Sequence, residues 1–331
     1  MKDLTKGKPS SLILSFAFPI FLANLLQLTY SLADTRIVGS FLGEDALAAV
    51  GSTSTVSNLI IGFLLGLANG FAIITAQRFG AKDIKGMKKS FAASILLGTG
   101  ISIVLTVLGM VFKNALLGFL NVPHNLYDEA GAYIFIIIAG MTATFLYDSC
   151  AAVLRALGDT ITPLIILLIS VALNITGDLF FVVVLKTGVR GAAIATVLAQ
   201  IIAFAICFIY MVKKYEILRL TKSDFTTLDG NLVRNMLGSG LSMGFMSSLV
   251  NIGSLTLQTA INKLGQDIIV AHTAARKISE MFMIMFTVFG QTMATYCGQN
   301  MGAGRIDRVK TGIKAALIYT CSWCVLTVIA S

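Results

Sequence analysis

The residues with the most unusual chemistry in this chain of 331 residues lie inside apolar runs. Asn174 and Asp178 stand one helical turn apart within the stretch 161–184, so a helix would place both on one face. Asp34 lies toward the end of a second apolar run, 12–36. Burying an ionisable residue in a bilayer costs at least ~2.5 kcal/mol, so each carboxylate needs a partner. Because no Lys or Arg stands at comparable depth in this half of the chain, a small cation, Na⁺ or H⁺, is the simplest partner.

Two structural alternatives remain open for these carboxylates. Asp34 could lie at the membrane interface and pair with Arg36. Asn174 and Asp178 could instead belong to a hydrogen-bond network that joins helices, which is common in membrane bundles. The other polar residues that could converge on this pair are Thr196, Asn24 and Gln27.

The elements that must position these residues are membrane-spanning helices. Apolar residues make up 56% of the chain and charged residues only 12%, against about 25% charged in a typical soluble domain. The apolar runs are continuous rather than alternating, which predicts an all-α integral membrane protein and not a β-barrel. Nine spans are expected, at 12–36, 47–77, 90–112, 130–153, 161–184, 191–212, 235–261, 268–298 and 312–331.

The basic residues predict the orientation of these spans. The net charge of +9 is not gathered into a face that would bind nucleic acid. Most Lys and Arg residues instead occupy the N-terminus and every second loop, which is the positive-inside pattern. We therefore expect a multi-pass protein of the plasma or inner membrane with a cytoplasmic N-terminus and no nucleic-acid partner.

An internal repeat predicts two similar halves. The segment Leu42–Asp45 matches Leu264–Asp267, and at the same offset Gln77 matches Gln299 and Gly80-Ala81 matches Gly302-Ala303. Since six spans precede the second copy, both copies have the same orientation, as in some secondary transporters. The expected domains are an N-lobe of six helices at 1–213, a cytoplasmic linker at 214–234 and a partial C-lobe of three helices at 235–331. A full second lobe would extend further, so we expect the chain to be C-terminally incomplete.

Other motifs bear on how such a protein would work. Pro19 removes a backbone hydrogen bond in the middle of the first span and predicts a kink, either static or a hinge. The sequence contains no phosphate-binding loop that would indicate ATP as an energy source. It also contains no set of catalytic residues that would indicate an enzyme. No metal-ligand spacing surrounds the histidines, and we expect no cofactor apart from a coupling ion.

Several segments together resemble the multidrug and toxic compound extrusion (MATE) transporters of the MOP superfamily. They are Ala33–Gly39, Leu42–Val50, Ala76–Ala81, Leu154–Pro163, Asn174–Asp178, Gly191–Thr196 and Gly298–Gly304. The resemblance implies a two-lobe helical bundle that exports drugs or metabolites in exchange for Na⁺ or H⁺ by alternating access. In the DinF-like branch the cation site lies in the N-lobe, and by motif position it would comprise Asp34, Asn174, Asp178 and Thr196.

The resemblance also implies a substrate cavity and a substrate class. Amphipathic, cationic small molecules would bind between the lobes of a monomer, in a cavity to which we assign Asn24, Gln27, Tyr30, Met243 and Met285. An alternative is a flippase for lipid-linked oligosaccharide or polysaccharide from the same superfamily. Such flippases carry several basic residues inside the cavity, and the first half of this chain has almost none.

Overall fold

The computed structural model describes residues 2–120, 122–261 and 266–330, and these form helices without a strand. The long helices are α1 (Pro9–Leu42), α2 (Glu44–Gly80), α3 (Ile84–Val111), α5 (Tyr127–Ala156), α6 (Ile161–Asp178), α7 (Val189–Lys214), α9 (Gly230–Ile261), α10 (Gln266–Gly302) and α11 (Ile306–Ala330). Shorter elements are α4 (Lys113–Phe119), α8 (Lys222–Thr226), the 3₁₀ turns at His124–Leu126 and Glu216–Leu218, and a π-helical turn at Leu179–Val184. The prediction of an all-α fold is confirmed.

Seven helices in the described part of the chain are long and apolar enough to cross a membrane. They are α1, α2, α3, α5, α7, α11 and the combination of α6 with its π-helical turn, and each overlaps one of the expected spans over almost all of its length. The other two expected spans form α9 and α10, which have 32 and 37 residues.

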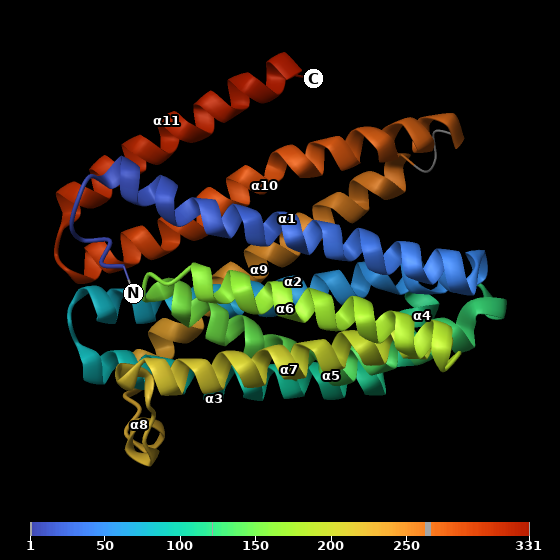
Figure 1. Ribbon diagram of the computed structural model, residues 1–331, viewed down its shortest axis with the longest axis horizontal. Helices are drawn as coiled ribbons and strands as arrows, with labels where there is room; N and C mark the ends of the chain where they lie inside the picture. The colour runs from blue at the N-terminus through green and yellow to red at the C-terminus, as the bar shows by residue number, and fades with distance from the viewer. Residues whose placement is uncertain (1, 121, 262–265, 331) are drawn as a thin grey trace.

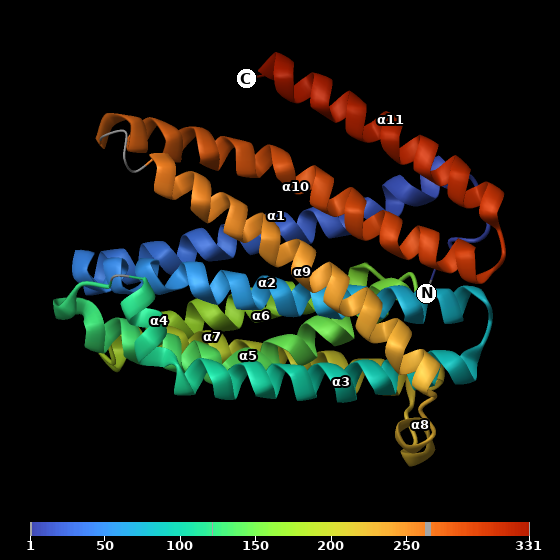
Figure 2. The same cartoon turned by 180° about the vertical axis from the view of Figure 1, so that it is seen from behind.

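The helices gather at one end of the molecule and diverge at the other. In Figure 1 the start of α1, the end of α10 and the start of α11 lie together near the N-terminus. At the opposite end, α9, α10 and α11 splay away from the bundle formed by α1 to α7, and Figure 2 shows the same divergence from behind. The end where the helices meet is the one that the basic residues predict to be cytoplasmic.

Glycines permit a close contact between α2 and α9. A Cβ atom on Gly66 of α2 would lie 2.6 Å from the carbonyl oxygen of Met243 on α9, and one on Gly70 would lie 2.5 Å from that of Ser239. Helix α9 therefore crosses α2 at a distance that only a residue without a side chain permits (Figure 2).

The lengths of the helices agree with the internal repeat. Helices α2 and α10, which begin at equivalent positions of the two copies, are both 37 residues long. The first matching residues of the second copy, Leu264 and Gly265, fall in the stretch 262–265 outside the described residues. The division into lobes at 1–213, 214–234 and 235–331 stays a prediction.

Candidate cation-binding site

Four polar residues predicted from sequence meet where α1, α6 and α7 pack together. Asn174 and Asp178 project from α6 and are 2% and 0% exposed, which makes them deeply buried polar groups. The Asn174 Nδ2 atom donates a hydrogen bond of 3.1 Å to the Thr196 Oγ1 atom on α7. The Asp34 carboxyl group reaches from α1 close enough to the Asp178 carboxyl group for the two to interact electrostatically. The structure thus brings residues separated by more than 100 positions into one site.

The oxygen atoms of this cluster lack hydrogen-bond donors. Asp34 Oδ1, Asn174 Oδ1 and both carboxyl oxygens of Asp178 are buried and have no partner within the described part of the chain. Buried polar groups in native proteins nearly always have a partner, so acceptors left over in one place need a donor from outside the chain. Two carboxyl groups and an amide oxygen facing one another are suited to a proton or a hard cation.

The tyrosines around this cluster come from two further positions. The Tyr30 hydroxyl on α1 lies 3.4 Å from Thr196 Oγ1, so Tyr30, which we assigned to the substrate cavity, adjoins the candidate cation site. Tyr133 on α5 packs on the neighbouring apolar cluster of Val38, Val182 and Val189, and its phenol interacts with both Asp34 and Asp178. Sequence analysis missed Tyr133, because nothing in its spacing indicates that α5 meets α1 and α6 here.

The backbone changes its geometry directly after Asp178. Helix α6 ends at Asp178 and the chain continues as a π-helical turn, Leu179–Val184. π-Helical turns are rare and occur frequently at functional sites, because the extra residue shifts the following side chains around the axis. Asp178 therefore occupies the junction between two helix geometries.

The alternative in which Asp34 pairs with Arg36 is not what the described residues show. Arg36 is exposed, and no ion pair joins it to Asp34 among the described residues. The same residues contain no group of three or more His, Cys, Asp or Glu side chains that could hold a metal ion. The unpaired Asp34 carboxyl is thus directed to Asp178 rather than to a basic side chain.

The other residues assigned to a cavity lie in different places. The Asn24 amide donates 2.8 Å to the Ile20 carbonyl of its own helix, and Gln27 is exposed. Met243 lines a small cavity between α2 and α5 on one side and α9 and α10 on the other. Met285 instead packs against the apolar cluster at the start of α1. Pro19 lies within α1, which continues through it, and its role as a hinge stays a prediction.

The cavity that Met243 lines contains a charged residue that sequence analysis overlooked. Its volume is about 40 Å³, and Arg155 of α5 lies in its wall, where the Nη2 atom donates 3.3 Å to the Asn69 Oδ1 atom of α2. Asp148, two turns earlier on α5, is half-buried and acts electrostatically on this guanidinium. The rule that identified Asp178, a carboxylate within an apolar run, applies equally to Asp148.

Comparison with known proteins places the chain in a family. A family model described as MatE matches residues 19–180. A Bacillus subtilis protein named "Probable multidrug resistance protein YpnP" is 30% identical over 93% of this chain and 68% of its own length. The chain belongs to the MATE family. Membership together with the seven apolar helices makes it a multi-pass membrane protein of a transporter family.

Two further similarities agree with this MATE assignment. "DNA damage-inducible protein F" from Escherichia coli is 24% identical over 87% of this chain and 62% of its own length. The solved structure described as the outward-facing conformation of a multidrug resistance MATE family transporter of the MOP superfamily has a TM-score of 0.91. It is 22% identical and covers 99% of this chain and 72% of its own chain, so it shows the two-lobe MATE-type fold.

Proposed function

We propose that this MATE-family protein exports amphipathic, positively charged small molecules across the plasma or inner membrane in exchange for Na⁺ or H⁺. The observation that carries the proposal is the group of buried acceptor oxygens on Asp34, Asn174 and Asp178 without donors. Relatives named as multidrug resistance proteins support an export role. The N-terminus would be cytoplasmic, the coupling ion would be the only cofactor, and the working unit would be a monomer.

The geometry suggests how an ion would act on the helices. Two buried carboxylates that face each other repel, and a proton or cation between them removes that repulsion. Ion binding would therefore draw α1, which carries Asp34, toward α6, which carries Asp178. An ion drives a conformational change only through its different affinity for the two states. Asn174, held by Thr196, would supply a neutral oxygen ligand in the state that binds the ion.

Cation binding can be tested directly on the purified full-length chain. Thermal unfolding is followed in NaCl and in choline chloride at equal ionic strength, and again over a range of pH. A ligand at ten times its Kd stabilises the state that binds it by about 1.4 kcal/mol. We expect Na⁺, or for a proton site a change of pH, to shift the Tm of the wild type by more than that of Asp178→Asn, which keeps only the response of other titrating groups.

The matched control is Thr176→Ala on the same helix. Thr176 is exposed, and its hydroxyl donates only to the Ala172 carbonyl of α6, so this variant should respond to the ion as the wild type does. If Asp178→Asn keeps the full response to both Na⁺ and pH, the assignment of the cation site is wrong.

A second candidate is flipping of a lipid-linked oligosaccharide or polysaccharide. The observation that favours it is Arg155, whose guanidinium could receive a pyrophosphate in the cavity between the two sets of helices. Asp148 on the same helix opposes an anion there. Accumulation of lipid-linked precursors in a deletion strain, reversed by the wild-type chain, would support this candidate over drug export.

A further inference from the structure

The segment 2–8, which precedes α1, is anchored although chain termini are usually free unless something holds them. Leu4 is only 1% exposed and packs with Phe16 of α1 and with Val288 and Tyr296 of α10. Figure 1 shows this segment running beside the end of α10 and the start of α11. A buried leucine in a terminal segment indicates that the segment is part of the helix assembly.

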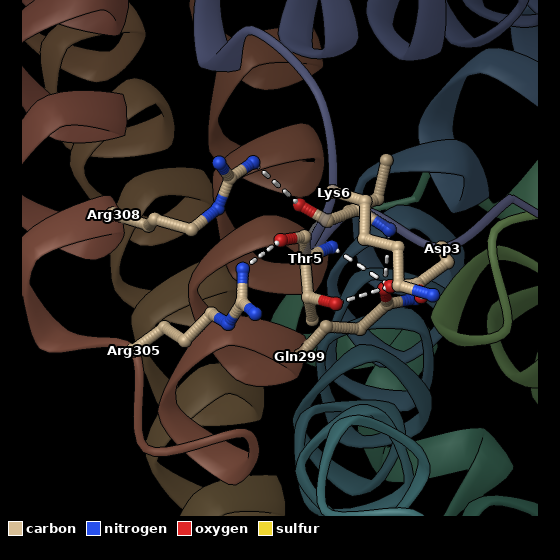
Figure 3. Close-up of polar contacts among 7 residues, drawn as sticks. Asp3, Thr5, Lys6, Gln299, Arg305 and Arg308 are labelled. Carbon is tan, nitrogen blue, oxygen red and sulfur yellow. Dashed lines mark hydrogen bonds and ion pairs between the residues drawn. The ribbon is translucent and has the colours of Figure 1, made fainter.

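Hydrogen bonds to its main chain hold the segment in place (Figure 3). The Leu4 N–H donates 2.9 Å to Gln299 Oε1, and the Leu4 carbonyl accepts from Asn300 Nδ2 at 3.2 Å. Arg308 Nη2 donates to the same Leu4 carbonyl at 3.3 Å, and Arg305 Nη1 donates 2.9 Å to the Thr5 carbonyl. Both guanidinium groups thus bind backbone carbonyls of one segment, and such charge-assisted hydrogen bonds are the stronger kind.

The contacts around segment 2–8 also reach the end of α5, in the bundle formed by α1 to α7. Gln299 Nε2 donates 2.8 Å to the Ala156 carbonyl at the end of α5, so one amide group joins α10 to both Leu4 and α5. Gly158 has a φ of +84°, and a Cβ there would lie 2.1 Å from the Lys2 carbonyl oxygen. Segment 2–8 is therefore wedged among α5, α10 and α11 at the end where the helices converge.

We propose that residues 2–8 form a latch, released and re-formed during the working cycle, that holds this end of the molecule closed. The end cannot open while Gln299 of α10 stays bonded to both Leu4 and Ala156, because Leu4 leads into α1 and Ala156 belongs to α5, and both helices lie in the bundle from which α10 would separate. The latch continues into α1, the helix that carries Pro19 and Asp34, so movement of α1 acts on it directly. Only its use in a transport cycle rests on the proposed function.

A native cysteine reports on the latch. Cys297 of α10 is partly buried and packs on the cluster that contains Leu4. In the full chain with Cys150, Cys207, Cys321 and Cys324 replaced by Ala, the rate of maleimide labelling at Cys297 measures how often this cluster opens. We expect Arg305→Gln/Arg308→Gln to raise the rate about tenfold, equivalent to about 1.4 kcal/mol.

The control removes the same charge from neighbouring positions on α11. Lys310 and Lys314 on α11 are exposed, so Lys310→Gln/Lys314→Gln should label within about twofold of the parent rate. Equal rates in the arginine variant, the lysine variant and the parent would overturn the latch.

A second pair of variants keeps the test decisive if the double arginine variant does not fold. Leu4→Ala removes the buried anchor, whereas Leu14→Ala removes a leucine that is 45% exposed on α1. The latch requires faster labelling only in Leu4→Ala, and equal rates in these two variants would contradict it. Since labelling needs no ion gradient, the latch and the proposed function can fail separately. Faster labelling in Leu4→Ala, together with an Asp178→Asn variant whose Tm responds to Na⁺ and pH as fully as the wild type, would reject the proposed function and keep the latch.

Discussion

At the scale of single residues, the candidate cation site depends on the hydroxyl group of Thr196 as well as on its two carboxyl groups. Thr196 accepts from the Asn174 amide and lies beside the Tyr30 hydroxyl, so it fixes which atom of Asn174 faces Asp178. An amide nitrogen turned toward the carboxylates would add a donor where a cation needs oxygen atoms. Thr196 therefore has a positioning role in the account of ion binding.

Replacing this hydroxyl should weaken ion binding without abolishing it. We expect Thr196→Val to raise the apparent Kd for the coupling ion about fivefold, since the loss of one hydrogen bond costs about 1 kcal/mol. Thr196→Ser keeps the hydroxyl and should bind almost as well as the wild type. The measurement is the ion concentration that gives half of the stabilisation against thermal unfolding, and identical values for Val and wild type would refute this role.

Asp159, between α5 and α6, provides a pH-dependent contribution to stability. Burial tends to raise its pKa, but hydrogen bonds from the Tyr215 hydroxyl at 2.6 Å and from Thr162 outweigh burial and hold the pKa below its usual value. A carboxyl group with a lowered pKa in the folded state stabilises the protein above its unfolded-state pKa. That stability is lost as the pH falls through the folded-state pKa.

Tyr215→Phe should accordingly destabilise the protein in a pH-dependent way. We expect a loss of about 1 kcal/mol at neutral pH, or about 2–4 °C in Tm, that disappears as Asp159 becomes protonated at acidic pH. Tyr127→Phe is the control, because that hydroxyl donates to the Asn114 carbonyl, which does not titrate. A loss in Tyr215→Phe that is independent of pH would show that Asp159 is not its cause.

At the scale of elements, the crossing of α2 and α9 depends on glycine. Gly66→Ala places a methyl group 2.6 Å from the Met243 carbonyl oxygen, which forces the helices apart. Such overpacking typically costs about 1–3 kcal/mol. We expect a lower Tm for Gly66→Ala, whereas Gly51→Ala on the same helix, with nothing within 4 Å, should be neutral or slightly stabilising. Equal Tm values for the two variants would contradict the described crossing.

Some elements could be predicted from the sequence and others could not, for physical reasons. Continuous apolar runs located the long helices, and the one-turn spacing of Asn174 and Asp178 placed both on one buried face. The approach of Tyr133 to Asp34 depends on how α5 packs against α1, which no local pattern encodes. The anchoring of Leu4 was equally hidden, because its partners Gln299 and Asn300 lie almost the whole chain away.

At the scale of the whole molecule, α1 connects the features that matter for transport. Its first turns adjoin the latch at the closed end, and Asp34 lies toward its other end, beside α6. In this conformation the helices meet at the end predicted to be cytoplasmic and diverge at the opposite end (Figure 1). An ion that enters from the divergent side would reach Asp34 on α1 and Asp178 on α6. Because the latch continues into α1, movement of α1 on ion binding would act on the latch.

The most direct test of this account measures export itself. The full-length chain is reconstituted into proteoliposomes, and movement of a fluorescent cationic dye is followed after a Na⁺ or pH gradient is imposed. We predict gradient-driven dye transport by the wild type and by Thr176→Ala, and at least a tenfold slower rate for Asp178→Asn. Dye transport by Asp178→Asn at the wild-type rate, with the same dependence on the gradient, would contradict the account.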